Sequence, residues 1–383
     1  MRVGVRDTGR SGQEGTRHAS IGSVGPHEVT GTPLPVDVDD VTPSWLSEVL
    51  DVPVTAVDVV ARHSGTTGRA RIALTYGRDA PDRPTAMFVK LAPFDERQRR
   101  FVDAVGLGIA EARFYRDVAA SVAVRVPRVW HAAVEEGRYV MVLEDLVASG
   151  CRFPSPDDGD LDVVTGRLVD ELAELHGPFW ESPALDDGPL AFVGDGGRLQ
   201  FGAGGPFIAR AVARFASEMP PVFTRLGDLY VEAAPQVAEL WASLPRTLAH
   251  GDPHLGNLFV DGERPGFFDW GMVMPRAGMW DVAYVLCGSV PTELRRAREA
   301  EWIRRYCDGL ARHGVELDEG EAWDQYRLFA IYAWVSSTST AGVGDRWQTE
   351  AVGRDGMARA TAAVDDLDAV THLEACLAGT VSP

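Results

Sequence analysis

The sequence predicts an α+β fold in which a small antiparallel sheet precedes a larger, mostly helical part. Two observations support this prediction. Strand-like runs separated by short turns fill the chain up to Leu146. From about residue 157 onward, apolar residues recur mainly at helical spacing. With 383 residues, the chain is long enough for two lobes, and a ligand is expected in the cleft between them.

The composition is that of an ordinary globular protein with a large acidic excess. Hydrophobic residues make up 45% and charged residues 24% of the chain. The formal net charge of -19 argues against nucleic-acid binding, which needs a basic surface. The four cysteines have no paired spacing, so we expect neither a zinc site nor disulfides, and a cytoplasmic location. No apolar run is long enough to predict a membrane span.

The first part of the chain is predicted as a lead, a helix and five strands. Residues 1–38 are rich in Gly, Ser, Thr and Pro, and we expect them to form a disordered lead. A helix should follow, with Thr42 as its N-cap and Pro43 at its first position. A further helical segment should end near residue 120. The strands of this N-lobe, residues 39–146, are expected over 54–62, 69–76, 86–91, 128–134 and 138–146.

The second part, residues 147–383, is predicted to be a mostly helical C-lobe. An amphipathic pattern predicts a helix over 161–176, and a segment rich in Gly, Asp and Pro predicts a loop over 181–206. Later helices are expected over about 207–217 and 222–243, and again from about residue 271 to the end. A strand, a loop and a hairpin over 247–270 interrupt them.

The densest cluster of polar residues is TLAHGDPHLGNLFVDGERPGFFDWG, which begins at Thr247. Asp252 and Asn257 lie in a loop between two apolar strands. The turn DGERP should return the second strand of a hairpin beside the first, which brings Asp269 near Asn257. Two carboxylates and an amide carbonyl then converge on a site suited to Mg²⁺, which prefers a few such oxygens together with phosphates. Asp252 can remain free of the metal and receive a hydroxyl proton.

Lys90, in the stretch AMFVKLAP, is the only lysine in the chain. Its apolar neighbours, such as Phe88 and Leu91, predict a buried position or a position in a cleft. An ammonium without a partner would be costly there. A compact ammonium differs from the planar, five-donor guanidinium that every other basic side chain carries, so position 90 should require the slimmer cation.

The order HGDxxxxN, followed by an apolar hairpin and DW, resembles the aminoglycoside phosphotransferase/choline kinase-like family. The resemblance covers about residues 54–340 and implies a bilobal protein-kinase-like fold. The stretches YVMVLEDL and PRAGMWDVAYVL also resemble the ecdysteroid-kinase-like branch. Gly251 stands where protein kinases have Arg, and Trp270 replaces the Phe of their DFG motif. Peptide substrates are therefore not expected.

The resemblance implies a role for each matching position. Asp252 matches the catalytic aspartate of the family, and Asn257 and Asp269 match its metal ligands. Lys90 matches the strand lysine that binds the α- and β-phosphates. Glu111, in EARFY, matches the helix glutamate that pairs with this lysine.

Two further groups match nucleotide-binding positions of the family. The hinge strand, whose backbone groups bind adenine, corresponds to Glu144, Asp145 and Leu146. The phosphate-binding turn corresponds to Gly65, Thr66, Thr67 and Gly68. This turn contains fewer glycines than the loop of protein kinases, and a simple hairpin turn explains its residues equally well.

The remaining polar residues near the motif are interpreted mainly as structural. His250 and Asp281 match positions that brace the catalytic loop in the family. His176 is expected to pack in the core or to cap a helix end. For His254, a structural role and a contact with phosphate are both left open.

These residues together predict an ATP-dependent O-phosphotransferase that uses Mg²⁺ and acts on a hydroxyl of a small molecule. Asp-rich loops would suit an aminoglycoside-like acceptor or another amino alcohol. Phe153, Phe179, Trp180 and Phe201 would equally suit a sterol-like or macrolide acceptor. The alternative is a catalytically silent nucleotide-binding module on the same fold, which the presence of all five matched site residues disfavours. Neither nucleic acid nor a membrane is expected as a partner.

Overall fold

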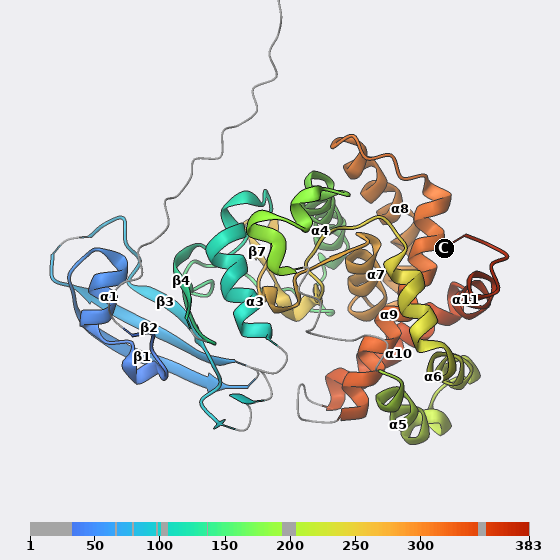
Figure 1. The fold of residues 1–383 in the computed structure, drawn as a ribbon, viewed down its shortest axis with the longest axis horizontal. Coiled ribbons are helices and arrows are strands. Elements are labelled where there is room, and N and C mark those ends of the chain that lie inside the picture. Colours follow the sequence, from blue (N-terminus) through green and yellow to red (C-terminus); the bar gives the residue numbers. More distant parts are fainter. Residues whose placement is uncertain are drawn as a thin grey trace, which may run out of the picture. The chain divides into compact units, whose positions relative to one another are not determined.

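In the N-terminal half an antiparallel sheet comes first, and helices dominate the remainder of the chain (Figure 1). This is the predicted α+β arrangement. The described residues belong to one compact unit, Thr32–Pro383. The computed structural model describes residues 33–65, 67–78, 80–96, 99–100, 106–135, 137–193, 204–343 and 350–382.

The sheet has five antiparallel strands in the order β1-β2-β3-β5-β4. Its central strand is β3, which pairs with β2 on one side and β5 on the other. The predicted strands are confirmed, although β1 continues two residues beyond its predicted end and so shortens the following turn. The strands are β1 (Val54–Ser64), β2 (Gly68–Tyr76), β3 (Ala86–Leu91), β4 (Val129–Glu135) and β5 (Arg138–Glu144).

Helix α1 (Pro43–Leu50) packs on the sheet through one apolar face. As predicted, Thr42 caps it, and its Oγ1 accepts a hydrogen bond of 3.3 Å from the backbone N–H of Trp45. Leu34 and Val38 are buried in the same core. The lead was predicted to be disordered up to residue 38, but residues 33–38 are folded against the sheet. Residues 1–32 lie outside the described part of the chain.

Helix α3 (Leu107–Arg113) packs against β4 and β5 and continues as a π-helical segment, Phe114–Val118. Gly108 permits this approach, because a Cβ there would lie 2.1 Å from the ring of Tyr139. The predicted helical character up to about residue 120 is confirmed from residue 107 onward. Residues 101–105 lie outside the described part.

The C-terminal helices share one large hydrophobic core. Helix α4 has its predicted bounds, and α5 and α6 begin and end within two residues of theirs. The predicted loop over 181–206 is partly wrong, because it contains two 3-10 helices, Pro183–Leu185 and Gly188–Val193. The helices are α4 (Leu161–His176), α5 (Gly205–Phe215), α6 (Pro221–Ala242), α7 (Met279–Gly288), α8 (Thr292–Ala311), α9 (Glu319–Val343), α10 (Glu350–Asp366) and α11 (Ala369–Leu377).

Two short strand pairs lie between α6 and α7. β6 (Thr247–Ala249) pairs with β9 (Met274–Arg276), and β7 (Leu258–Asp261) forms the predicted hairpin with β8 (Arg264–Phe267). The segment between β6 and β7 ends in one 3-10 turn, Leu255–Asn257. Among the described helices, none is long and apolar enough to cross a membrane.

Candidate active site

The lone lysine lies between two carboxylates. Lys90 Nζ is 2.7 Å from Oε1 and 2.6 Å from Oε2 of Glu111, and 3.4 Å from Oδ1 of Asp269. The side chains of Lys90 and Glu111 are 5% and 1% exposed, whereas that of Asp269 is 36% exposed. We call these three residues the Lys90 cluster. It joins the central strand β3, helix α3 and the segment after β8.

The three charges of the Lys90 cluster change one another's acidity. Burial opposes the charge on Lys90, but Asp269 and Glu111 outweigh it and raise the pKa of Lys90. Burial raises the pKa of Glu111 to about 7, although Lys90 acts in the opposite direction. Burial also acts to raise the pKa of Asp269, but Lys90 and Arg69 outweigh it, so that this pKa is lowered. Lys90 and Asp269 are therefore both charged at neutral pH.

Asp269 adopts a left-handed backbone conformation, with φ 65° and ψ 62°. Such a conformation costs a non-glycine residue about 1–3 kcal/mol and is concentrated at functional sites. The next residue, Trp270, is buried and stacks on Phe114, with ring centroids 3.9 Å apart and an interplanar angle of 9°. This stack anchors the strained turn and ties Asp269 to the helical segment that carries Glu111.

The segment His250–Asn257, here called the HGD loop, is braced by α7. Asp281 Oδ2 accepts a hydrogen bond of 2.6 Å from the backbone N–H of His250, and its Oδ1 accepts one of 2.9 Å from Gly251. Gly251 has φ 86°, and a Cβ there would lie 2.2 Å from the carbonyl oxygen of Met272. Only glycine fits this position. The expected bracing role of Asp281 agrees with this geometry.

Asp252 presents a partly exposed carboxylate at the centre of the HGD loop. Its Oδ2 accepts a hydrogen bond of 3.1 Å from Asn257 Nδ2. Burial raises the pKa of Asp252, while His254 and Tyr284 act to lower it. Asp252 therefore binds a proton more readily than a carboxylate in water does.

Asn257 lies beside Asp269 across the hairpin, because its carbonyl oxygen accepts a hydrogen bond of 3.0 Å from the backbone N–H of Phe268. Its Nδ2 donates both to the carboxylate of Asp252 and, at 3.0 Å, to the backbone oxygen of the same residue. The amide nitrogen is thus fully engaged, which leaves Oδ1 as an acceptor. The structure therefore brings Asp252, Asn257 and Asp269 together as predicted.

These residues fit Mg²⁺ bound together with phosphates. The amide oxygen of Asn257 and the partly exposed carboxylate of Asp269 are hard oxygen donors. Over the described residues, no group of three or more His, Cys, Asp or Glu side chains is placed to hold a metal ion.

A cleft adjoins the Lys90 cluster and is lined by both apolar and charged side chains. Its apolar walls include Phe88 and Leu143 from the sheet, and Phe153 and Phe268 from the second part of the chain. Its charged lining includes the Lys90 cluster. We call this the Lys90 cleft. Its mixed lining suits a ligand with both an apolar and an anionic part.

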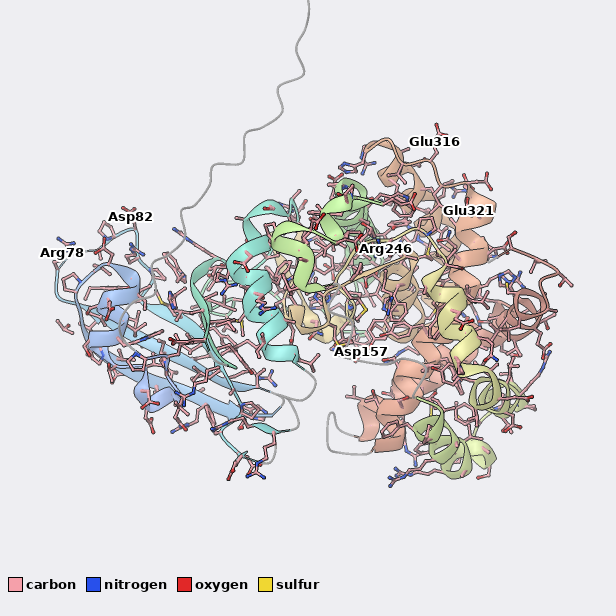
Figure 2. All side chains as sticks on the ribbon, viewed as in Figure 1. Arg78, Asp82, Asp157, Arg246, Glu316 and Glu321 are labelled. Atoms are coloured by element: carbon pink, nitrogen blue, oxygen red, sulfur yellow. The ribbon has the colours of Figure 1, made fainter. Side chains whose placement is uncertain are left out.

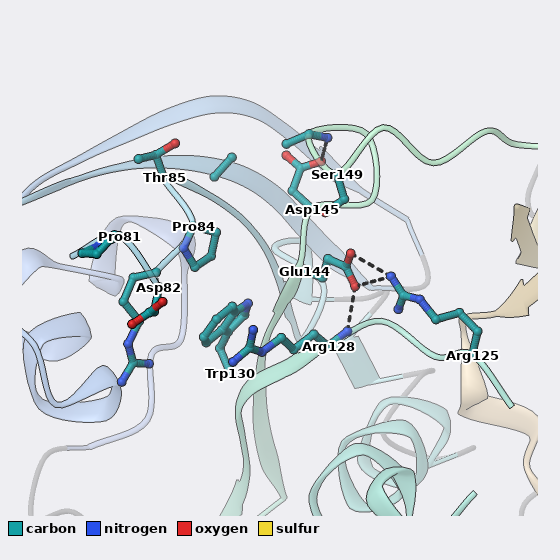
Figure 3. Close-up of a pocket in the computed structure, with 13 residues that line it drawn as sticks. Pro81, Asp82, Pro84, Thr85, Arg125, Arg128, Trp130, Glu144, Asp145 and Ser149 are labelled. Carbon is teal, nitrogen blue, oxygen red and sulfur yellow. Dashed lines mark hydrogen bonds and ion pairs between the residues drawn. The ribbon is translucent and has the colours of Figure 1, made fainter. Parts of the chain in front are cut away.

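The segment Glu144–Leu146 borders the Lys90 cleft, and its acidic side chains are engaged by arginines. Figure 3 shows the carboxylate of Glu144 between the guanidinium of Arg125, at 2.8 Å, and the backbone N–H of Arg128, at 2.9 Å. Asp145 Oδ2 accepts a hydrogen bond of 2.8 Å from Arg71 Nε. These contacts fix the conformation of the segment. Sequence reasoning missed all three arginines.

Among the described residues of the turn between β1 and β2, none lines the Lys90 cleft. Gly65 donates a backbone hydrogen bond of 3.1 Å to Thr67, which is buried. A Cβ on Gly68 would lie 2.6 Å from the carbonyl oxygen of Ala92, so this glycine is required for packing. The lining of the cleft begins only at Arg69. Thr66 lies outside the described residues, and phosphate binding by this turn stays a prediction.

The other histidines of the motif region make structural contacts. His176 is fully buried, with Nε2 3.2 Å from Asp281 Oδ2 and Nδ1 2.8 Å from the hydroxyl of Tyr306. It packs in the core, in agreement with the interpretation from the sequence. His254 Nδ1 accepts a hydrogen bond of 3.0 Å from the backbone N–H of Gly256 and caps the 3-10 turn. Its Nε2 lies 3.7 Å from Asp252 Oδ2.

The fold and this site define a kinase-like phosphotransferase, in which a strand lysine, a helix glutamate and an acidic loop border one cleft. Residues 71–329 match the model of the phosphotransferase enzyme family. The chain belongs to this family. No match is found among curated protein sequences.

Similar solved structures are found at low sequence identity. One, described as a candidate aminoglycoside phosphotransferase of Ralstonia eutropha, is 15% identical over 85% of this chain and 97% of its own, with a TM-score of 0.53. The ethanolamine kinase of Plasmodium vivax is 14% identical over 80% and 81%, with a TM-score of 0.47. The choline kinase LicA of Streptococcus pneumoniae is 13% identical over 86% and 98%, with a TM-score of 0.45.

Proposed function

We propose that the protein is an ATP-dependent O-phosphotransferase that transfers the γ-phosphate to a hydroxyl of a small molecule. One observation carries this proposal in a member of the phosphotransferase enzyme family: Asn257 is hydrogen-bonded both to the carboxylate of Asp252 and to the residue before Asp269, and so connects the HGD loop to the Lys90 cluster. Four buried free cysteines agree with a reducing cytoplasm as its location.

The nucleotide would lie in the Lys90 cleft. Apolar side chains such as Phe88 and Phe268 would contact the adenine, and backbone groups of Glu144–Leu146 would bind its edge. Lys90 would donate to the α- and β-phosphates while Glu111 fixes its position. Mg²⁺, held by Asn257 and Asp269, would neutralise charge on the phosphates.

Asp252 would act on the acceptor. Phosphoryl transfer passes through a loose transition state, so the protein mainly positions the reacting groups. The carboxylate of Asp252 would accept a hydrogen bond from the acceptor hydroxyl, orient its oxygen toward the γ-phosphate and take its proton as the new bond forms. Its raised pKa favours this late proton transfer.

We infer that the acceptor occupies a second pocket, which borders the HGD loop on the side of α10. His254 and Tyr284 line this pocket near Asp252, and the loop residue Asp157 and the α10 residue Asp355 add carboxylates. We call it the α10 pocket. In Figure 2, Asp157 lies away from the labelled Glu316 and Glu321 at the far side of the helical part. The loop over 150–160 would thus form part of the acceptor site.

The lining of the α10 pocket favours a polar acceptor. Hydroxyl groups come from Ser337 and Thr340, and several small residues leave room for a bulky molecule. Of the aromatic residues expected to form an apolar acceptor site, Phe153 borders the Lys90 cleft instead. Neither Phe179 nor Trp180 lines the α10 pocket, and Phe201 lies outside the described residues. We therefore propose an amino alcohol or an aminoglycoside-like molecule as the acceptor, rather than a sterol-like one.

A panel of acceptors tests this function. The purified protein, ATP and Mg²⁺ are incubated with aminoglycosides, choline, macrolides or hydroxylated lipids, and the products are identified by their mass. We expect phosphate transfer to a polar amino alcohol or aminoglycoside. Tight ATP binding without transfer to any member would favour the silent nucleotide-binding module. Phosphorylation of generic proteins would instead favour a protein kinase.

A further inference from the structure

Arg359, on helix α10, lines the α10 pocket and contacts the end of helix α7. Its Nε donates a hydrogen bond of 3.0 Å to the backbone oxygen of Gly288, the last residue of α7. The final carbonyl groups of a helix have no partners within that helix, so this contact satisfies one of them. The same contact fixes the guanidinium at the edge of the pocket.

Close packing of α10 on α9 sets the position of Arg359. A Cβ on Gly353 would lie 3.2 Å from the Cα of Ala341, and a Cβ on Gly356 would lie 3.5 Å from Ser337 Oγ. Glycine at position 353 therefore allows the two helices to approach closely. Arg359 follows Gly356 by three residues, so it continues the same face of the helix. Helix packing, rather than a surface loop, thus places its guanidinium.

The charge of Arg359 has no direct counter-charge in the described part of the chain. There, no carboxylate forms an ion pair with its guanidinium, and no acceptor contacts its two terminal nitrogens. Burial lowers the pKa of Arg359, whereas Asp355, one turn earlier on α10, acts in the opposite direction. By contrast, Arg354 on the same helix pairs with Glu218 at 2.7 Å. The half-buried guanidinium of Arg359 therefore has unused donors at the pocket.

These unused donors indicate an anionic group on the ligand of the pocket. A charge that is partly removed from water is costly without a partner. The contact with α7 needs only Nε, and the two terminal nitrogens of a guanidinium form a fork that binds a carboxylate through two hydrogen bonds. Two carboxylates, Asp157 and Asp355, also line the pocket. They suit an amine on the same ligand.

We propose that the acceptor carries a carboxylate group and that the guanidinium of Arg359 binds it inside the α10 pocket. The inference rests on the proposed function, because it takes this pocket as the acceptor site. It narrows the acceptor to an amino alcohol that is also an acid. The amine would lie near Asp157 or Asp355. The hydroxyl would lie on the side of His254, whose Nε2 is 3.7 Å from Asp252 Oδ2.

The first test measures the binding of matched probes and needs no turnover. The members of each pair differ by one carboxylate: ethanolamine and serine, and glucosamine and glucosaminuronic acid. In calorimetric titrations of the wild type, the acid of at least one pair should have a Kd about tenfold lower or more, because a hydrogen bond to a charged group is gained. Equal Kd values within both pairs, or no binding of either acid, would overturn the proposal.

Two variants separate this role from the contact with α7. Arg359→Gln removes the charge and the fork, so the preference for the acid should disappear while the Kd of the other member stays nearly unchanged. Arg354→Gln is the matched control, because Arg354 lies on the same helix and pairs with Glu218. It should keep the preference of the wild type.

A loss of affinity for both members alike in Arg359→Gln would indicate a merely structural role and contradict the proposal. Arg359→Lys replaces this variant if it does not fold. Lysine keeps the charge but lacks the fork, so the preference for the acid should become smaller without disappearing. An undiminished preference in a folded Arg359→Lys variant would contradict binding by the fork.

The second test measures phosphate transfer from ATP to the same probes. The wild type should have the higher kcat/KM for the acid of a pair, and Arg359→Gln should raise the KM for that acid with little change in kcat. If the acid binds through Arg359 but receives no phosphate, the proposed function fails and the binding role of Arg359 stands. If the wild type phosphorylates both members equally well, the proposed function stands and this inference fails.

Discussion

The position of Lys90 explains why this residue is the only lysine in the chain. One nitrogen atom lies within 3.4 Å of two carboxylates that come from different elements. A compact ammonium can make these contacts from a single point, whereas a guanidinium spreads its donors over a wide plane. The side chain is 5% exposed, so the surrounding atoms leave little room for the larger group.

We therefore expect Lys90→Arg to lower kcat/KM for ATP by about a hundredfold or more, although charge is conserved. Disturbance of a buried ion pair costs about 3–5 kcal/mol, which would displace Glu111 or the phosphates. Steady-state kinetics with ATP measure the effect. Arg62→Lys, on the exposed strand β1, is the control and should behave as the wild type. Normal phosphorylation by Lys90→Arg would contradict the argument from shape.

Asp252→Asn should abolish turnover and leave ATP binding nearly intact. The amide cannot accept a proton from the acceptor, and loss of a general base typically lowers kcat about 10²- to 10⁴-fold. The nucleotide would contact the Lys90 cluster and the walls of the cleft, which this substitution does not alter. Calorimetric titration with ATP and an assay of kcat separate the two effects. Unchanged turnover would exclude Asp252 as the base.

The buried carboxyl of Glu111 should make the stability of the fold depend on pH. Its pKa is raised from 4.5 to about 7, so the folded state binds the proton more tightly than the unfolded state does. Stability is then greatest below pH 4.5 and falls as the pH rises toward 7, by roughly 3 kcal/mol from this group alone. Urea unfolding at several pH values measures it. In Glu111→Gln this component should disappear, and an identical pH dependence in both proteins would refute its origin in Glu111.

At the scale of elements, the sequence predicted the helices whose bounds depend on residues close by in the chain. Helix α4 was delimited by its apolar periodicity, and α1 by Thr42 and Pro43. The π-helical segment Phe114–Val118 could not be predicted, because it accompanies a contact between Phe114 and the distant Trp270. The left-handed conformation of Asp269 has the same origin, since its cost is met by packing around Trp270. Tertiary contacts decide such features.

The stack of Phe114 on Trp270 should matter for the stability of the fold as a whole. Phe114→Ala removes a fully buried ring and is expected to lower the free energy of unfolding by about 3–5 kcal/mol. The comparison is Phe153→Ala, whose residue is 43% exposed and whose effect should be clearly smaller. Urea denaturation of both variants measures the difference. Equal effects would show that the stack contributes no more than a surface contact.

At the scale of the whole molecule, the sequence predicted the fold and the residues of the Lys90 cluster but not the α10 pocket. The cluster was accessible because HGDxxxxN, DW and the lone lysine are each short patterns with a chemical meaning. The α10 pocket has no such pattern. It combines a loop before α4 with residues of α7, α9 and α10, which are up to about two hundred residues apart. Only the packing of these helices brings them together.

The Lys90 cluster also affects how a divalent cation and a nucleotide would bind in the cleft. One ammonium facing two carboxylates already has its charge compensated from within the protein. In the proposed function, the phosphates of a nucleotide would therefore compete with Asp269 for the same cation, in a chain with a formal net charge of -19. Nucleotide alone would add negative charge to a negative site. Divalent cation and nucleotide should consequently bind with positive cooperativity, each supplying the counter-charge that the other needs.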